Sequence, residues 1–194
     1  MPFGFRTILK KLIILYDLIR FFLSKKLFGF ENATKILYSC LKESVIPILR
    51  TNGAQIGNNC DIGSPLIFHN ARDFSNLCIG DNCHIGKNCF FDLYESILIG
   101  NNVAIGMNTT IITHFQPISQ TKLRYIYKTE IQKVIIEDGV HILANCLILM
   151  GVTINKNSLI GANSLVNKSI PANYLAYGNP VKLIKSIWIT DEKK

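Results

Sequence analysis

The chain has 194 residues, of which 48% are hydrophobic and 18% are charged. This composition is apolar enough to bury the core of one domain, and it excludes a disordered chain. The formal net charge of +8 indicates an anionic partner, such as a phosphorylated ligand, nucleic acid or an acidic membrane surface. No uncharged run approaches the roughly 18 residues that a membrane-spanning helix needs, which argues against a spanning protein.

Residues 1–50 are expected to form an N-terminal helical segment, because apolar residues recur three and four positions apart. Gly29 and Asn32 predict a break between two helices, and Pro47 is expected to end the second. The segment holds nine of the Lys and Arg residues and only three acids. Residues 6–26 therefore read as a basic amphipathic helix, which either contacts an anionic membrane or covers the open end of the domain that follows.

The six cysteines are expected to be free thiols of a cytoplasmic protein. The beginning of the chain is basic, but Asp17 and Arg20 interrupt its apolar stretch and no small-residue cleavage site follows. We therefore expect no secretory signal. Contact with the inner face of the membrane remains compatible with this interpretation.

After Thr51 the sequence changes to a period of six residues. An aliphatic residue recurs at every sixth position, and a small or β-branched residue follows four positions later. The longest unbroken aliphatic series is Ile136, Ile142, Ile148, Ile154, Ile160 and Val166. This period predicts a solenoid, in which short strands alternate with tight turns and the aliphatic side chains fill a narrow axis. Gly and Asn are expected at the turns because they tolerate positive φ.

The same register explains four of the cysteines. Cys60, Cys83, Cys89 and Cys146 occupy the small position of a hexad, so we expect them to be core residues rather than metal ligands. Cys40 and Cys78 have no place in the register. No histidine partner for a metal or a catalytic thiol is visible beside them.

The repeats resemble those of the hexapeptide-repeat acyltransferases, and the resemblance covers residues 51–185. It is strongest to the maltose and galactoside O-acetyltransferases and to related capsule and O-antigen sugar acetyltransferases. Three segments support it, namely 91–95 (FDLYE), 111–114 (IITH) and 177–185 (YGNPVKLIK). The resemblance implies a left-handed parallel β-helix, the cytoplasmic transfer of acetyl from acetyl-CoA to a sugar hydroxyl in polysaccharide biosynthesis, and a cyclic homotrimer with active sites between subunits.

The repeat breaks once over a long stretch. Ile111 and Ile136 are 25 residues apart, one more than four hexads, and polar and aromatic residues fill the interval. We expect a loop protruding over residues 114–133. Residues 186–194 follow the last motif and are expected to form a short C-terminal tail.

His114 is the expected catalytic base, because an imidazole can accept a proton at neutral pH. By resemblance, Asp92 binds a sugar hydroxyl or orients His114, and Glu95 binds substrate. His84 and His141 fall at turn positions and are expected on the surface, while His69 lies in the irregular stretch 64–76.

The acetyl-CoA site is also implied by resemblance. Ala144 and Ala162 are expected to line the pantetheine arm, and Asn167, Lys168, Lys182 and Lys185 are expected at the phosphates. The implied mechanism needs no metal.

Several alternatives remain open at this stage. The acceptor could be an amino group on a nucleotide-linked sugar, or serine. A γ-class carbonic anhydrase is disfavoured, because no His-x4-His pair exists. A non-enzymatic β-helix scaffold remains a weaker alternative, and nucleic-acid binding has no support beyond charge.

Overall fold

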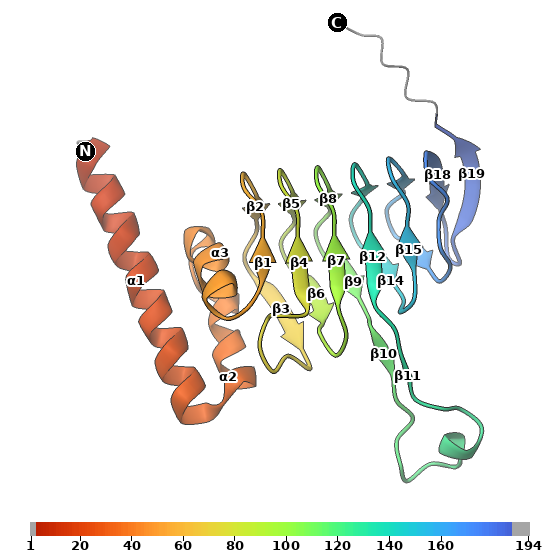
Figure 1. Ribbon diagram of the computed structural model, residues 1–194, viewed down its shortest axis with the longest axis horizontal. Helices are drawn as coiled ribbons and strands as arrows, with labels where there is room; N and C mark the ends of the chain where they lie inside the picture. Colours follow the sequence, from red (N-terminus) through yellow and green to blue (C-terminus); the bar gives the residue numbers. More distant parts are fainter. Residues whose placement is uncertain (1–2, 188–194) are drawn as a thin grey trace, which may run out of the picture.

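The computed structural model describes residues 3–187 as a stack of β-coils with helices at one end (Figure 1). The helices are α1 (Phe3–Phe28), α2 (Phe30–Thr34), the 3-10 helix η1 (Lys35–Tyr38) and α3 (Lys42–Thr51). The break after α1 falls at Gly29, whose φ of 84° suits a residue without a side chain. Asn32 lies inside α2, and the chain turns again before α3.

The expectation that Pro47 ends a helix is wrong, because Pro47 lies inside α3. Proline removes one backbone donor and would ordinarily break the helix. Here the residues on either side, Val45, Ile48 and Leu49, are completely buried against the rest of the protein. Tertiary packing of this face outweighs the missing hydrogen bond.

The coils form three parallel sheets, which we call the first, second and third faces, and the prediction of a mainly-β parallel β-helix is confirmed. The first face consists of β1 (Gln55–Ile56), β4 (Leu77–Ile79), β7 (Ile97–Ile99), β12 (Val134–Ile136) and β15 (Thr153–Ile154). The second consists of β2 (Asp61–Ile62), β5 (His84–Ile85), β8 (Ala104–Ile105), β13 (His141–Ile142), β16 (Leu159–Ile160), β18 (Tyr174–Tyr177) and β19 (Lys182–Ser186). The third consists of β3 (Leu66–His69), β6 (Cys89–Asp92), β9 (Thr110–Ile111), β14 (Leu147–Ile148) and β17 (Leu165–Val166).

The axis of the β-helix is filled as the period predicts. All six members of the aliphatic series from Ile136 to Val166 are buried. The small positions are buried too. Where a cysteine stands there, its thiol donates to a carbonyl of the next coil, as Cys89 does to Gly106 and Cys146 to Gly161. Cys60, in the first coil, is only half-buried. All six cysteines are free, and burial raises the pKa of Cys89 to about 11.

Asn and Gly have different roles at the turns, a difference that the sequence did not reveal. Ten asparagines have positive φ, among them Asn145 at 62°. None of the glycines in the Ile-Gly pairs has positive φ. At Gly106 an added Cβ would lie 2.6 Å from the backbone nitrogen of Ala144 in the next coil. Asn therefore supplies the left-handed turn, and Gly allows the coils to approach.

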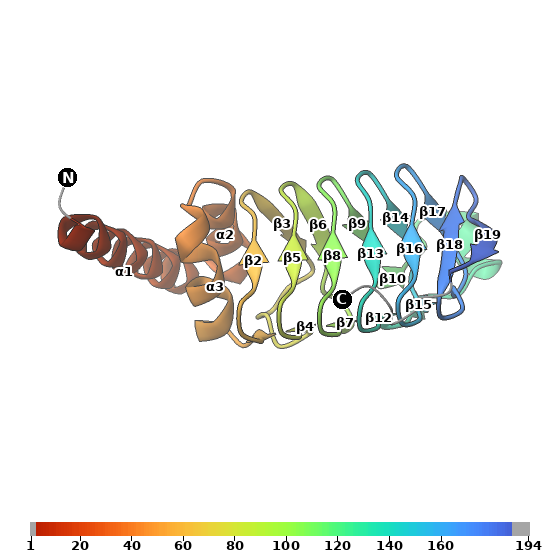
Figure 2. The ribbon, with the colours of Figure 1, turned by 90° about the horizontal axis from the view of Figure 1, so that it is seen from above.

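Helices α2, η1 and α3 cover the first coil with buried side chains that include Leu37. Helix α1 packs on this cap through Asp17 and Phe21. Figure 2 shows it projecting outward from the cap, and in Figure 1 it runs steeply across the direction in which the coils stack. The hydroxyl of Ser44 donates to the Asp17 carboxylate at 2.7 Å. The face of α1 that looks away from the cap stays exposed and apolar. We call it the α1 stripe: Ile8, Leu12, Leu15, Ile19 and Phe22.

At the other end, β19 pairs antiparallel with β18 and closes the second face. Residues 188–194, which make up most of the expected tail, lie outside the described residues. Within residues 3–187, no helix combines the length and hydropathy needed to cross a membrane.

Candidate active site

Three segments leave the β-helix at one edge, each directly after a strand of the third face (Figure 1). They are the loop between β3 and β4, the loop between β6 and β7, and a long excursion after β9. In the last two coils the chain turns tightly at the same corner, after β14 and β17. The polar groups around His114 come from these segments and from the ends of the strands that precede them.

The excursion after β9 is a two-stranded arm. Its strands, β10 (His114–Phe115) and β11 (Glu130–Ile131), pair antiparallel, and the 3-10 helix η2 (Lys122–Tyr125) lies near its tip. Apolar side chains of the tip are exposed: Ile118, Leu123, Tyr125, Ile126 and Tyr127. His114 thus starts the arm, at the point where it leaves the coil.

His114 and Asp92 form a close pair at this edge. The Nδ1 atom of His114 lies 2.5 Å from Oδ2 of Asp92. Asp92 ends β6 and is 1% exposed, and the same carboxylate oxygen accepts hydrogen bonds from the backbone N–H and the hydroxyl of Thr113 at 3.0 and 3.1 Å. The other oxygen accepts from the Asn70 amide at 3.0 Å. Both carboxylate oxygens are therefore occupied by protein donors.

This environment keeps Asp92 ionised. Burial by itself would raise the pKa of the carboxyl, but hydrogen bonds from His114, Asn70 and Thr113 outweigh it, so the pKa lies below its ordinary value. An ionised Asp92 holds the proton of His114 on Nδ1. The Nε2 atom is then the ring nitrogen with a free lone pair.

Asn70 and Tyr94 complete the surroundings of the imidazole, and the sequence analysis assigned a site role to neither, although Tyr94 lies in the segment 91–95. The Asn70 amide nitrogen lies 3.5 Å from Nε2 of His114. The Tyr94 ring stacks on the imidazole at 4.7 Å between centroids and 18° between planes. One signal could have revealed Asn70: it follows the third-face strand in its coil, as Leu93 does after Asp92 in the next coil.

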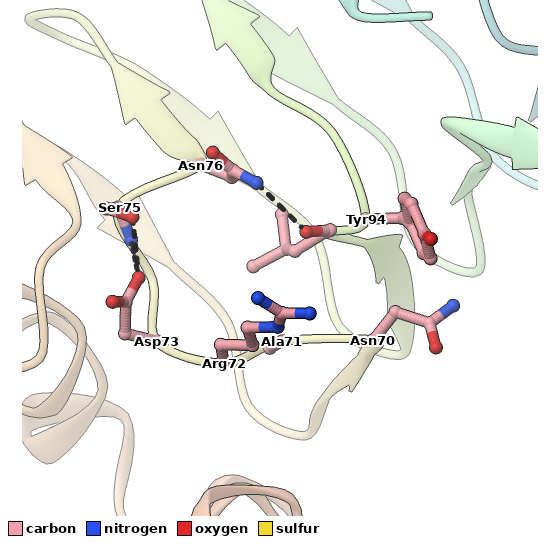
Figure 3. Close-up of a pocket in the computed structure, with 8 residues that line it drawn as sticks. Asn70, Ala71, Arg72, Asp73, Ser75, Asn76 and Tyr94 are labelled. Atoms are coloured by element: carbon pink, nitrogen blue, oxygen red, sulfur yellow. Dashed lines mark hydrogen bonds between the residues drawn. The ribbon is translucent and has the colours of Figure 1, made fainter. Parts of the chain in front are cut away.

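A pocket of about 560 Å³ adjoins this pair, and we call it the edge pocket (Figure 3). Asn70 and Tyr94 line it and also contact His114. Its other walls include Arg72, Asp73 and Asn76 from the β3–β4 loop. A molecule in the edge pocket would therefore contact two residues that themselves contact the imidazole.

Glu95 is placed differently from Asp92. Its carboxylate accepts hydrogen bonds from the backbone N–H and hydroxyl of Ser96 at 2.7 and 2.8 Å, and the backbone donor lowers its pKa. Glu95 is not among the residues that line the edge pocket.

Of the other histidines, His84 and His141 lie on the second face, and His69 lies opposite Asp92 in the register of β3 and β6. His84 and His141 start the second-face strands β5 and β13, rather than lying in turns as expected, and both are exposed. Nδ1 of His84 pairs with Asp61 at 3.1 Å. His69 ends β3 with its side chain exposed.

The residues expected to bind acetyl-CoA lie in later coils. Ala144 and Ala162 follow β13 and β16 at one corner, where Asn163 donates its backbone N–H to the Ala144 carbonyl at 3.0 Å. The remaining four are exposed and lie near the end of the stack: Asn167, Lys168, Lys182 and Lys185. In the described part of the chain, none of these lysines forms an ion pair, and no cluster of three or more metal-ligating side chains occurs.

Comparisons with known proteins agree with this architecture. The sequence matches the family described as "Hexapeptide repeat of succinyl-transferase" over residues 77–112 and 133–168, and the interval between the two matches contains the arm. A galactoside O-acetyltransferase of Lactococcus lactis subsp. lactis (strain IL1403) is 36% identical over 157 residues, which are 78% of this chain and 72% of that protein.

Two solved structures show the same fold. A maltose O-acetyltransferase from Clostridium difficile 630 superposes with a TM-score of 0.68 at 29% identity, covering 90% of this chain and 89% of that one. A hexapeptide-repeat acetyltransferase from Vibrio cholerae O1 biovar eltor, solved in complex with acetyl-CoA, superposes with a TM-score of 0.68 at 26% identity, covering 91% and 88%. The chain therefore belongs to the hexapeptide-repeat acetyltransferases of the galactoside O-acetyltransferase type.

Proposed function

We propose that the protein transfers acetyl from acetyl-CoA directly to a sugar hydroxyl in the cytoplasmic synthesis of a polysaccharide, with His114 as the general base. The observation that carries this proposal is the His114–Asp92 pair at the rim of the edge pocket. The galactoside and maltose relatives support a sugar acceptor, and the acetyl-CoA complex of the Vibrio cholerae relative supports the donor.

The chemistry follows from the orientation of the imidazole. Nε2 of His114 takes the proton of the acceptor hydroxyl, while the oxygen of that hydroxyl attacks the thioester carbonyl carbon. The carbon–sulfur bond of the tetrahedral intermediate then breaks, and the departing thiolate of CoA takes the proton back from Nε2. Asp92 stabilises the transient imidazolium and keeps the proton on Nδ1.

Asp92 acts in this proposal by orienting His114 rather than by binding the sugar. Both of its oxygens already accept hydrogen bonds from protein donors. Glu95 differs from Asp92, since Ser96 occupies only one oxygen of its carboxylate. A part for Glu95 in substrate binding stays a prediction.

We place the donor along the later coils. The small side chains of Ala144 and Ala162 leave room for the pantetheine arm on successive turns. Asn167, Lys168, Lys182 and Lys185 offer amide and ammonium groups to the phosphates. Charge removal at Lys168 should raise the KM for acetyl-CoA more than the KM for a pantetheine thioester that lacks the nucleotide.

We further propose a homotrimer with the site completed between subunits. The arm carries five exposed apolar side chains at its tip, and it projects away from its own β-helix (Figure 1). A neighbouring copy would cover this tip and bring a second wall to His114. Light scattering should give three times the chain mass at micromolar protein, and a monomer mass would contradict the shared site.

Helix α1 supports a peripheral contact with anionic lipid. The members of the α1 stripe are spaced alternately four and three residues apart, so they share one face, opposite the side that carries Asp17 and Phe21. Exposed Lys11, Lys25 and Lys26 accompany it. Co-sedimentation with vesicles that contain anionic lipid should be lost in Leu15→Glu and in high salt.

The direct test of the proposed function is turnover. Purified protein with acetyl-CoA and a panel of sugars, amino sugars and serine should release CoA with a sugar hydroxyl acceptor and show an O-acetyl product by mass spectrometry. EDTA should leave the rate unchanged. Transfer only to an amine, or no binding of acetyl-CoA, would contradict the proposal.

A further inference from the structure

The edge pocket contains one cationic side chain without a protein partner. Arg72 comes from the β3–β4 loop, is exposed, and forms no hydrogen bond or ion pair within the described residues. Figure 3 shows its guanidinium rising from the loop into the space between Asn76 and Tyr94. A guanidinium presents several donors in a rigid plane, which suits a carboxylate or a phosphate.

The neighbouring acid does not neutralise this group by direct contact. The Asp73 carboxylate accepts hydrogen bonds from the backbone N–H and hydroxyl of Ser75 at 2.8 and 2.6 Å, and Figure 3 shows it turned toward Ser75. Asp73 still lines the pocket, so the pocket has one charge of each sign. The cation is the one whose donors are not in use.

The amide nitrogens of the two asparagines in the pocket are already engaged. The Asn76 amide donates to the Leu93 carbonyl at 3.1 Å, and the Asn70 amide donates to Asp92 at 3.0 Å. The half-exposed ring of Tyr94 offers a flat surface between these amides and His114. One face of that ring is stacked on the imidazole, so the approach to the base runs past Asn70, whose amide nitrogen lies 3.5 Å from Nε2 of His114. A sugar ring beside Asn70 would have one end toward that nitrogen and the other toward Arg72.

We propose that the acceptor carries an anionic group, a carboxylate or a phosphate, which Arg72 binds while a hydroxyl of the same acceptor faces His114. This inference rests on the proposed function and deepens it, because it names the class of acceptor. Binding between guanidinium and anion fixes which hydroxyl reaches the base. Arg72 is thus a specificity-determining residue of the edge pocket.

The test compares three small acceptors that share one sugar ring: methyl glucoside, methyl glucuronide and glucose 1-phosphate. Each is assayed for transfer from acetyl-CoA and, separately, titrated for binding to the full-length protein. An anionic compound should be preferred over the neutral one by about 10- to 100-fold, the usual contribution of a charge-assisted hydrogen bond. Comparing methyl glucuronide with glucose 1-phosphate shows whether Arg72 prefers a carboxylate or a phosphate.

Three variants sharpen the result. Arg72→Gln should abolish the preference, and Arg72→Lys should keep part of it, because the charge remains but the planar pair of donors is lost. Lys35→Gln removes the same charge from the surface of η1, outside the pocket, and should keep the full preference. Raising the salt concentration should weaken anion binding in the wild-type protein.

Equal binding of neutral and anionic compounds, or a preference that survives Arg72→Gln, overturns the inference. Failure of the proposed function gives a different result, because acetyl-CoA would then not bind and no acceptor would be acetylated. Transfer without anion preference leaves the acetyltransferase assignment standing and removes only the role of Arg72.

Discussion

Two regions of the protein use the six-residue repeat differently. From Ile136 to Val166 the hexads run without interruption, and every aliphatic position is buried. At the edge beyond the third face, the first three coils depart from the repeat, and these departures carry His114, Asp92 and Asn70. Regular coils bury side chains on a narrow apolar axis, where a reactive pair could not reach a substrate. The interruptions place polar groups outside that axis while the coils on either side hold them in register.

The largest effect that separates the two regions is expected at His114. His114→Ala should lower kcat/KM by roughly 10²–10⁴, the usual range for a general base. Thermal stability and acetyl-CoA binding should be retained, because His114 begins the arm and is not part of the hydrophobic core. His141→Ala is the matched control on the outside of a coil. A His114→Ala enzyme with wild-type turnover would refute the mechanism.

A substitution in the regular region should lower stability and leave substrate binding unchanged. Ile148→Ala should lower the free energy of unfolding by about 2–5 kcal/mol, since Ile148 is fully buried between Ile111 and Val166 of adjacent coils. Urea denaturation measures the loss. The folded fraction should keep its KM for both substrates. The neighbouring Leu147 is only half-buried, and Leu147→Ala should cost clearly less; equal losses would show that the axis is not the main source of stability.

Asp92 belongs to both regions, because it ends a strand and, in the proposed mechanism, orients the base. In Asp92→Asn, the side-chain amide cannot hold the proton on Nδ1 of His114 as a carboxylate does. The imidazole can then adopt the other neutral tautomer, in which Nε2 carries the proton and cannot accept one from the substrate. We expect kcat to fall by 10²-fold or more, within the general-base range, with a small change in the KM for the acceptor. A raised acceptor KM at unchanged kcat would instead assign Asp92 to sugar binding.

The same carboxylate predicts a pH effect on stability. Its folded-state pKa is lowered, so ionised Asp92 stabilises the folded protein above the ordinary carboxyl pKa of about 4. This contribution is lost as the pH falls through the lower folded-state value. Unfolding curves should therefore show the wild-type protein losing more stability than Asp92→Asn below about pH 4. Parallel curves for the two proteins would show that the carboxylate is not coupled to folding.

The smallest effect is expected at the turns. Asn145 has a φ of 62°, where a side chain with a Cβ and no local hydrogen bond is disfavoured. Asn145→Ala should cost about 1 kcal/mol of stability, and Asn145→Gly should be nearly neutral. Chemical denaturation of the two variants measures this difference in the free energy of unfolding. If Gly cost more than Ala, the amide rather than the backbone conformation would be what the turn needs.

The fold could be predicted from the sequence because each hexad meets the same physical demand. The buried axis and the thiols at Cys83, Cys89 and Cys146 follow from register alone. Pro47 could not be placed, since its helix depends on packing against the first coil. The role of the Ile-Gly glycines was also missed, because close approach between coils leaves no local signal.

The candidate site was only partly readable. His114 and Asp92 could be singled out individually, and their contact agrees with the register in which Phe91 lies opposite Ile111 in the next coil. Asn70 comes directly after β3, but Arg72 lies further along the irregular loop, where no period relates residue number to position. Their approach to the imidazole and the edge pocket depends on the path of that loop.

The two ends of the stack have a consequence for solubility. The strands of every coil pair with those of the next through their backbone edges, as the layers of a fibril do. At an uncovered end, a third-face strand of one copy could therefore pair with a third-face strand of another copy. Helices α2, η1 and α3 cover this growing edge at the first coil, and the reversed strand β19 covers the second face at the last. The caps thus hinder pairing between copies at the first coil and along the second face of the last. A substitution that loosens either cap would be expected to cause end-to-end aggregation, detectable as fibres by electron microscopy, before it unfolds a coil.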